Sequence, residues 1–149
     1  MSDQEVRSHL RSALAAVVDA EQNRVSAILI DSKIKIAEGI EKMRPIITLI
    51  QALKEEVGKV EGLEISPAVH GHMAIVRSET SVTTERLSIS TNYDNSTFVI
   101  EESSSFLMDG SWHEDRNEYA SAEDVIARVL ETVGKHIGGQ QAQRAHKSA

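Results

Sequence analysis

Apolar residues in the first part of the chain recur at helical spacing. Between Val6 and Val18 they fall three or four residues apart, the pattern of an amphipathic helix. From Val25 to Val60 two seven-residue series run four residues out of step, as in a coiled-coil seam. One of these series is apolar throughout and consists of Leu29, Ile36, Met43, Ile50 and Val57. The pattern predicts long N-terminal helices.

Two features of this region leave the arrangement of the helices open. Pro45 removes a backbone hydrogen bond inside a helix, so we expect a break near Met43 to Pro45. Residues Ser32–Ile36 alternate between polar and apolar and would also suit a short strand, but helix is the preferred interpretation. An unbroken helix from Val25 to Val60 would be roughly 54 Å long at 1.5 Å per residue. The segment is therefore expected to form either a helical hairpin or a coiled coil with another chain.

Beyond Gly62 and Pro67 the chain changes to alternating Thr, Ser, Val and Ile, which favours β-strands. Turn residues at Tyr93–Ser96 and at Asp109-Gly110 are typical of hairpins. The sequence therefore predicts a four-stranded antiparallel meander. The strands are expected near Ala68–Arg77, Val82–Thr91, Thr97–Leu107 and Ser111–Tyr119.

The last predicted element is an amphipathic helix packed on this sheet. Ser121 is placed to cap it and Gly138-Gly139 to end it. Its apolar stripe consists of Ala122, Val125, Ile126, Val129, Leu130, Val133 and Ile137. The fold class is therefore α+β. We expect a helical oligomerisation region at 1–60, the sheet with its C-terminal helix at 61–139, and a disordered tail at 140–149.

Charge is distributed unevenly along the 149 residues. Residues 1–60 are neutral overall, so residues 61–149 carry the whole net charge of −7. Between Glu79 and Asp124 there are eleven acidic residues against two basic ones, Arg86 and Arg116. This field repels phosphate backbones, so we do not expect nucleic-acid binding; a partner protein with a basic surface fits better. With no cysteine and no apolar run near the ~20 residues of a membrane span, we expect a cytoplasmic protein without membrane segments.

The sequence contains no nucleotide-binding, hydrolase or zinc-protease motif, which lowers the expectation of an enzyme, and no cofactor is predicted. His70 and His72 would share one face of a strand, where His113 from a neighbouring strand could complete a metal site. Solvated surface histidines are the preferred interpretation. Residues Ser103–Ser105 are expected to form a bend or bulge rather than a catalytic site.

Adjacent carboxylates occur at Glu55-Glu56, Glu101-Glu102 and Glu114-Asp115. Neighbouring residues on a strand point to opposite faces, so the two pairs in strands do not converge by themselves. We interpret all three pairs as surface residues.

These observations favour a non-catalytic protein-binding or adaptor protein. It is expected to self-associate, as a homodimer or higher oligomer, through Leu29, Ile36, Met43, Ile50 and Val57, because the sheet offers too little surface to cover that stripe. One alternative is a small-molecule-binding domain or metal-dependent enzyme with its site near His70, His72 and His113. A second, weaker alternative is a secretion-type chaperone, which the small size and acidity would suit.

Overall fold

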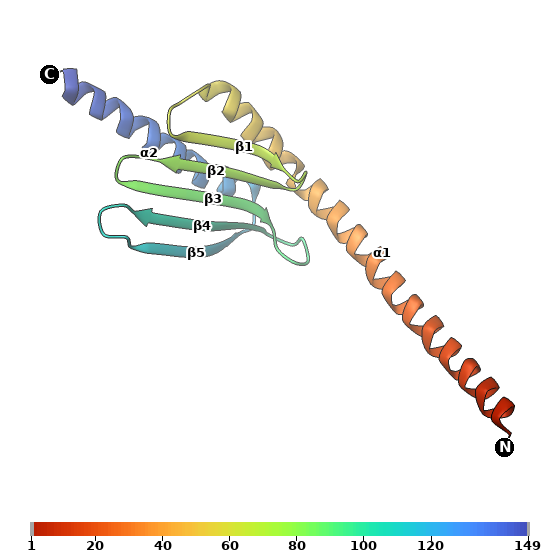
Figure 1. Ribbon diagram of the computed structural model, residues 1–149. Coiled ribbons are helices and arrows are strands. Elements are labelled where there is room, and N and C mark those ends of the chain that lie inside the picture. Colours follow the sequence, from red (N-terminus) through yellow and green to blue (C-terminus); the bar gives the residue numbers. More distant parts are fainter. Residues whose placement is uncertain (1, 149) are drawn as a thin grey trace. The chain divides into compact units, whose positions relative to one another are not determined.

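The computed structural model describes residues 2–148 and has an α+β fold (Figure 1). Helix α1 spans Asp3–Val57 and helix α2 spans Ala122–Ser148. Between them five antiparallel strands lie in the order β1-β2-β3-β4-β5, so the predicted meander is confirmed. The strands are β1 Leu63–Val69, β2 Met73–Glu79, β3 Thr83–Thr91, β4 Phe98–Phe106 and β5 Trp112–Tyr119.

The chain divides into two units, and the boundary falls inside α1, between Ala37 and Glu38. The first unit is helical, and all of its described residues up to position 34 are exposed. The second unit contains the sheet, α2 and the hydrophobic core. It is a folded domain, and the last twenty residues of α1 belong to it.

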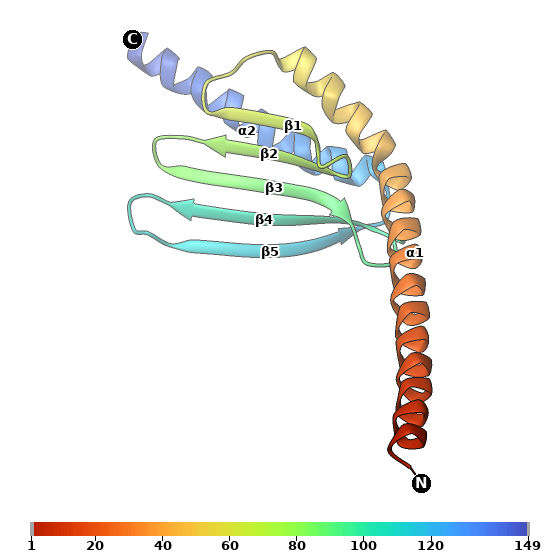
Figure 2. The ribbon, with the colours of Figure 1, turned by 45° about the vertical axis from the view of Figure 1, so that its right-hand side comes forward.

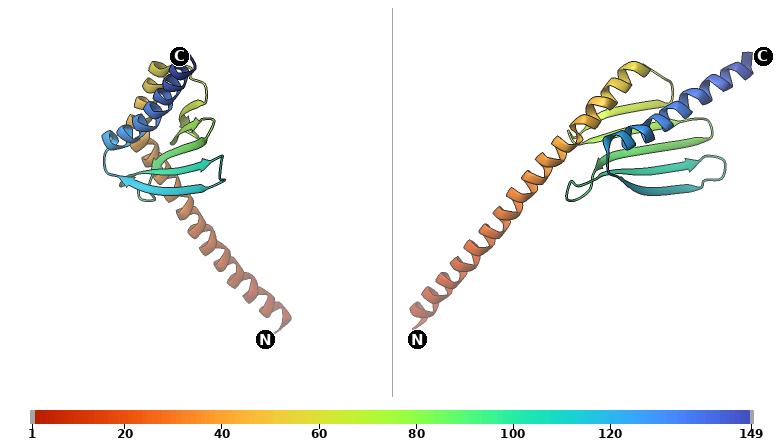
Figure 3. Two further views of the ribbon diagram at one scale, coloured as in Figure 1. Left: turned by 90° about the vertical axis from the view of Figure 1, so that its left-hand side faces the viewer. Right: turned by 180° about the vertical axis from the view of Figure 1, so that it is seen from behind.

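The core of the second unit lies on one face of the sheet. Cross-strand register places Ala74, Ile89 and Ile100 in one row and Val76 beside Leu87 in the next. Both α2 and the end of α1 pack against this face, while the other face is open (Figures 1 and 3). The helices contribute Met43, Ile46, Ile50, Val125, Val129 and Val133 to the core.

The predicted helix break and helical hairpin are wrong. Helix α1 continues through Pro45, and residues Ser32–Ile36 are helical rather than extended. Proline costs a helix roughly 3 kcal/mol. Met43, Ile46 and Ile50 are fully buried on both sides of Pro45, and each such side chain contributes roughly 1.5–3 kcal/mol. Packing on the sheet therefore keeps the helix intact.

The prediction of four strands is also wrong, because the expected strand Ala68–Arg77 is a hairpin. It contains the end of β1, a turn at His70–His72 and most of β2 (Figure 2). Pro67, which the sequence analysis places before the first strand, lies within β1. Since β1 is an edge strand, a missing N–H is tolerated there, and the register shifts between Ser66 and Val69.

Helix α2 is capped as predicted but extends further. The backbone N–H of Asp124 donates to Ser121 Oγ at 3.2 Å. The predicted end at Gly138-Gly139 and the predicted disordered tail from residue 140 are wrong, since α2 continues to Ser148. The side-chain amide of Gln140 donates to the backbone carbonyl of Glu61. This hydrogen bond fixes the helix just past the two glycines. Residue 149 lies outside the described residues.

Candidate functional site

The structure separates the five residues of the predicted interface into two groups. Met43 and Ile50 are completely buried in the domain core, and Val57 packs against that core. Leu29 and Ile36 are each 57% exposed. Met43, Ile50 and Val57 therefore cover the sheet of their own chain, and the only candidates left from this series are Leu29 and Ile36.

The exposed part of α1 carries many more large apolar side chains than these two. They occur from Val6 onwards, and most are about half exposed or more. The set consists of Val6, Leu10, Leu14, Val17, Val18, Val25, Ile28, Leu29, Ile30, Ile34 and Ile36. Soluble monomers rarely expose so much apolar side chain on one element. Residues 6–36 are therefore the leading candidate for an association surface, and we call them the exposed helix segment.

The predicted metal ligands do not come together. His70 and His72 lie in the turn between β1 and β2, where His70 has a positive φ of 54°. The Nδ1 atom of His72 lies 2.9 Å from the carbonyl oxygen of His70. His113 lies on β5 at the other edge of the sheet. Within residues 2–148 no group of three or more His, Asp or Glu side chains is arranged to hold a metal ion.

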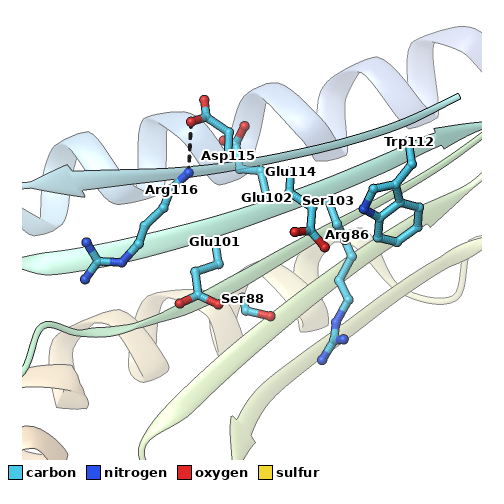
Figure 4. Close-up of a pocket in the computed structure, with 9 residues that line it drawn as sticks. All are labelled: Arg86, Ser88, Glu101, Glu102, Ser103, Trp112, Glu114, Asp115 and Arg116. Carbon is cyan, nitrogen blue, oxygen red and sulfur yellow. Dashed lines mark hydrogen bonds between the residues drawn. The ribbon is translucent and has the colours of Figure 1, made fainter.

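A shallow groove of about 640 Å³ crosses the open face of the sheet (Figure 4). Its walls come from β3, β4 and β5, with Trp112 and Arg116 at opposite ends. Two arginines, two glutamates and two serines point to this open face, whereas the carboxylates of Glu102 and Asp115 point toward the helix-covered face (Figure 4). The lining residues are Arg86, Ser88, Glu101, Glu102, Ser103, Trp112, Glu114, Asp115 and Arg116.

This groove holds no nucleophile beside a base. The expected bend or bulge at Ser103–Ser105 is wrong, because these serines pair in unbroken register with both β3 and β5. Register places Ser103 between Arg86 and Glu114, and neither of these activates a serine hydroxyl in the way a histidine does. The groove is therefore better suited to binding than to covalent chemistry.

An ion-pair network without a local sequence signature lies on the helix-covered face of the sheet. Arg128 Nε donates to Glu102 Oε1 at 2.6 Å, and its Nη2 donates to Glu85 Oε1 at 3.0 Å. Burial alone would lower the pKa of Arg128, but the two carboxylates hold that pKa above its ordinary value. Burial also raises the pKa of Tyr119, with a smaller contribution from Glu102. Because its partners are 26 and 43 residues away, no local pattern marks Arg128.

A buried serine and histidine also meet on this face. His136 Nδ1 lies 2.8 Å from Ser78 Oγ, and His136 Nε2 lies 2.8 Å from the carbonyl oxygen of Glu61. A carbonyl only accepts, so Nε2 donates to Glu61, and in a neutral imidazole Nδ1 then accepts from the Ser78 hydroxyl. Both side chains are buried, and both histidine nitrogens are occupied. His136 therefore joins α2 to β2 and to the turn before β1. Because both side chains are buried, a substrate cannot reach them.

Comparisons of the chain with protein-family models, with curated proteins and with solved structures found no match. Within residues 2–148 no helix combines the length and the apolar character needed to cross a membrane. The function must therefore be argued from the surfaces just described.

Proposed function

We propose that this chain is a non-catalytic protein-binding protein that self-associates through the exposed helix segment. The observation that carries the proposal is the set of apolar side chains exposed between Val6 and Ile36. Burying one leucine, isoleucine or valine contributes roughly 1.5–3 kcal/mol. Packing against further copies of the same helix would bury the whole set at once.

The local interactions of the exposed helix segment support the need for a partner. Two ion pairs lie along it, Glu21–Arg24 at 2.6 Å and Asp31–Lys35 at 3.4 Å. Such surface pairs are weakened by the surrounding water and contribute little to the stability of a helix. Helical stability in proteins comes mostly from packing of an apolar face. A helix of this length therefore gains most from association.

The distribution of apolar residues around the helix favours an assembly of more than two helices. At about 100° per residue, Ile34 lies nearly opposite Leu29 and Ile36, and Ile30 lies roughly a right angle away from Leu29. All four are more than half exposed. A two-stranded coiled coil covers one stripe only, whereas a bundle covers a helix from two sides. We therefore expect three or four helices to meet around residues 28–36.

The two other candidate sites support a role without catalysis. The groove at Trp112 lacks a nucleophile with a base, and the Ser78–His136 pair is buried. General acid–base and nucleophilic catalysis both require a reactive group that a substrate can approach. Binding is the activity that the accessible surfaces support best.

Charge placed on the apolar stripe tests this proposal. Leu14→Glu should lower the particle mass measured by light scattering, because an unpaired carboxylate would be buried between helices. Ser12→Glu is the matched control, since residue 12 is exposed on nearly the opposite side of the same turn of helix. The proposal requires the control to keep the wild-type mass. Equal masses for all three proteins would contradict it.

Ile34→Glu tests the number of helices separately. In a bundle of three or four helices it should reduce the assembly to a dimer held by the stripe that contains Leu29 and Ile36. An unchanged mass for Ile34→Glu would show that a single stripe accounts for the association and would contradict the bundle.

A further inference from the structure

We propose that the open edge of β5 binds an extended, basic segment of a partner protein by adding it to the sheet as a sixth strand. This inference rests on the proposed protein-binding role and assigns it a second surface, within residues 38–149. Strand addition uses backbone hydrogen bonds for affinity and neighbouring side chains for specificity. Both can be read from the structure.

The backbone of β5 presents hydrogen-bonding groups to the open edge. β5 is the last strand of the sheet, and it pairs with β4 alone. The N–H of Phe106 donates to the carbonyl of Ser111 at 3.1 Å, which fixes the hydrogen-bonded pairs of this hairpin. In antiparallel pairing, hydrogen-bonded and non-bonded residues alternate. Every second residue from Trp112 to Glu118 therefore turns its N–H and C=O away from β4.

The two edges of the sheet are protected to different degrees. At the β1 edge, Pro67 removes a donor and the register shifts between Ser66 and Val69, two features that discourage pairing with another strand. β5 has no proline, and its register with β4 is continuous over eight pairs. Only the N–H of Arg116 is covered, by Asp115 Oδ1 at 2.9 Å (Figure 4). The Asn117 side-chain amide also donates to Asp115 Oδ2 at 3.2 Å, and because both side chains are exposed an incoming strand can displace the Asp115 carboxylate.

Charge complementarity identifies the occupant. β5 carries Glu114, Asp115 and Glu118 against Arg116 alone, and Asp109 lies in the turn just before it. A second copy of β5 would bring like charges together, which disfavours pairing between copies. An anionic membrane and nucleic acid are disfavoured for the same reason. An extended segment rich in Lys or Arg would meet opposite charge along the whole edge.

Exposed apolar side chains at the start of β5 provide an anchor for this segment. Trp112 is 60% exposed and Met108 is 88% exposed. The turn that carries Met108 is already ordered, because Gly110 N–H donates to the Phe106 carbonyl at 2.9 Å and Leu107 N–H donates to the Val82 carbonyl at 2.9 Å. Exposed tryptophan and methionine are typical of binding surfaces, and a preformed turn reduces the entropy lost on binding.

A short peptide tests strand addition directly. The probe is a nine-residue peptide of alternating Lys and Val, blocked at both ends, titrated into the full-length protein. Trp112 is the single tryptophan, so its fluorescence reports binding near the start of β5. Hydrogen exchange of the Glu114, Arg116 and Glu118 amides reports the new strand. We expect a fluorescence shift, slower exchange at these amides, and weaker binding at high salt.

Two variants of Arg116 separate backbone pairing from charge attraction. Arg116→Ser removes a positive charge and should bind the basic peptide slightly more tightly than wild type. Arg116→Pro removes the same charge together with the outward N–H, and should bind roughly tenfold more weakly than Arg116→Ser. Because that N–H points away from β4, its loss leaves the pairing of β5 with β4 intact, and unchanged thermal unfolding verifies this.

Three results would overturn the inference. They are equal binding by the two Arg116 variants, equal binding of a Glu–Val peptide of the same length, and no response to the Lys–Val peptide at millimolar concentration. The proposed self-association is judged independently, since the particle mass depends on the exposed helix segment and should be the same in both Arg116 variants.

Discussion

Arg128 of α2 and Glu102 of β4 form a short ion pair, with Arg128 Nε donating to Glu102 Oε1 at 2.6 Å. The side chains are only 19% and 21% exposed. The same guanidinium also binds Glu85 on β3 and the hydroxyl of Thr132, so it links the helix to two strands. This network fixes the position of α2 on the part of the sheet that lies beside the apolar core and carries polar residues.

Removing the arginine should destabilise the domain more than removing a surface ion pair. Arg128→Met leaves two half-buried carboxylates without their cation, and we expect a loss of about 2–3 kcal/mol in the free energy of unfolding. Lys135→Met is the control, because the Lys135–Glu131 pair at 2.8 Å is largely exposed. The loss of free energy of unfolding in Lys135→Met should be much smaller than in Arg128→Met. Urea unfolding at one protein concentration measures both, and equal losses would contradict the assignment.

Two neighbouring residues of α1, one buried and one exposed, allow the contribution of core packing to be measured. Ile50→Ala should cost about 2–5 kcal/mol in unfolding free energy, because Ile50 is completely buried. Leu49→Ala changes the preceding residue, which is 46% exposed, and should cost much less. If Ile50→Ala instead lowered the particle mass and left the unfolding free energy unchanged, Ile50 would belong to an interface after all.

The seven-residue series shows why the sequence predicts the helices better than it predicts the surfaces against which they pack. Leu29 and Ile36 follow the same repeat as Met43 and Ile50, yet two are exposed and two are buried. An apolar stripe reports that a face needs covering, but it does not distinguish a sheet of the same chain from a second copy. The expected break at Pro45 failed for a related reason, since tertiary packing outweighed the local cost of proline.

The strand errors have a different origin. The sequence predicts His70 and His72 on one face of a strand because the composition changes to strand-forming residues after Gly62 and Pro67, whereas a hairpin turn at His70–His72 interrupts that segment. The last three strands were found nearly to the residue because Asp109-Gly110 and Tyr93–Ser96 mark clear turns. The Arg128 network was not foreseen because no local spacing joins residues so far apart in sequence.

The buried Ser78–His136 pair should behave as a coupled unit. His136→Leu leaves the Ser78 hydroxyl without its partner, whereas the Glu61 carbonyl keeps the hydrogen bond from the Gln140 side-chain amide. We expect a loss of roughly 1–3 kcal/mol for the unsatisfied hydroxyl. Adding Ser78→Ala to His136→Leu should recover part of this loss, since the unsatisfied hydroxyl is then removed. A double-mutant cycle by urea unfolding measures the coupling. Strictly additive losses would show that the hydrogen bond contributes nothing.

Asp109 should make the turn before β5 sensitive to acid. Hydrogen bonds from Ser111, chiefly from its backbone N–H at 2.9 Å, hold the pKa of Asp109 below its ordinary value. The stability this gives is complete above the ordinary pKa of about 3.9 and is lost as the pH falls through the lowered folded value. Asp109→Asn should remove this dependence. NMR titration of the Asp109 carboxyl measures the pKa directly, and a value at or above 3.9 would contradict the prediction.

Self-association through residues 6–36 is the central claim, and sedimentation equilibrium of the wild-type protein tests it most directly. Each chain has a mass of 16.4 kDa. At protein concentrations in the high micromolar range we predict a particle of three or four chains. The sedimentation profile should shift toward smaller species on dilution, as expected for reversible assembly. A single species of one-chain mass over the whole concentration range would contradict the account.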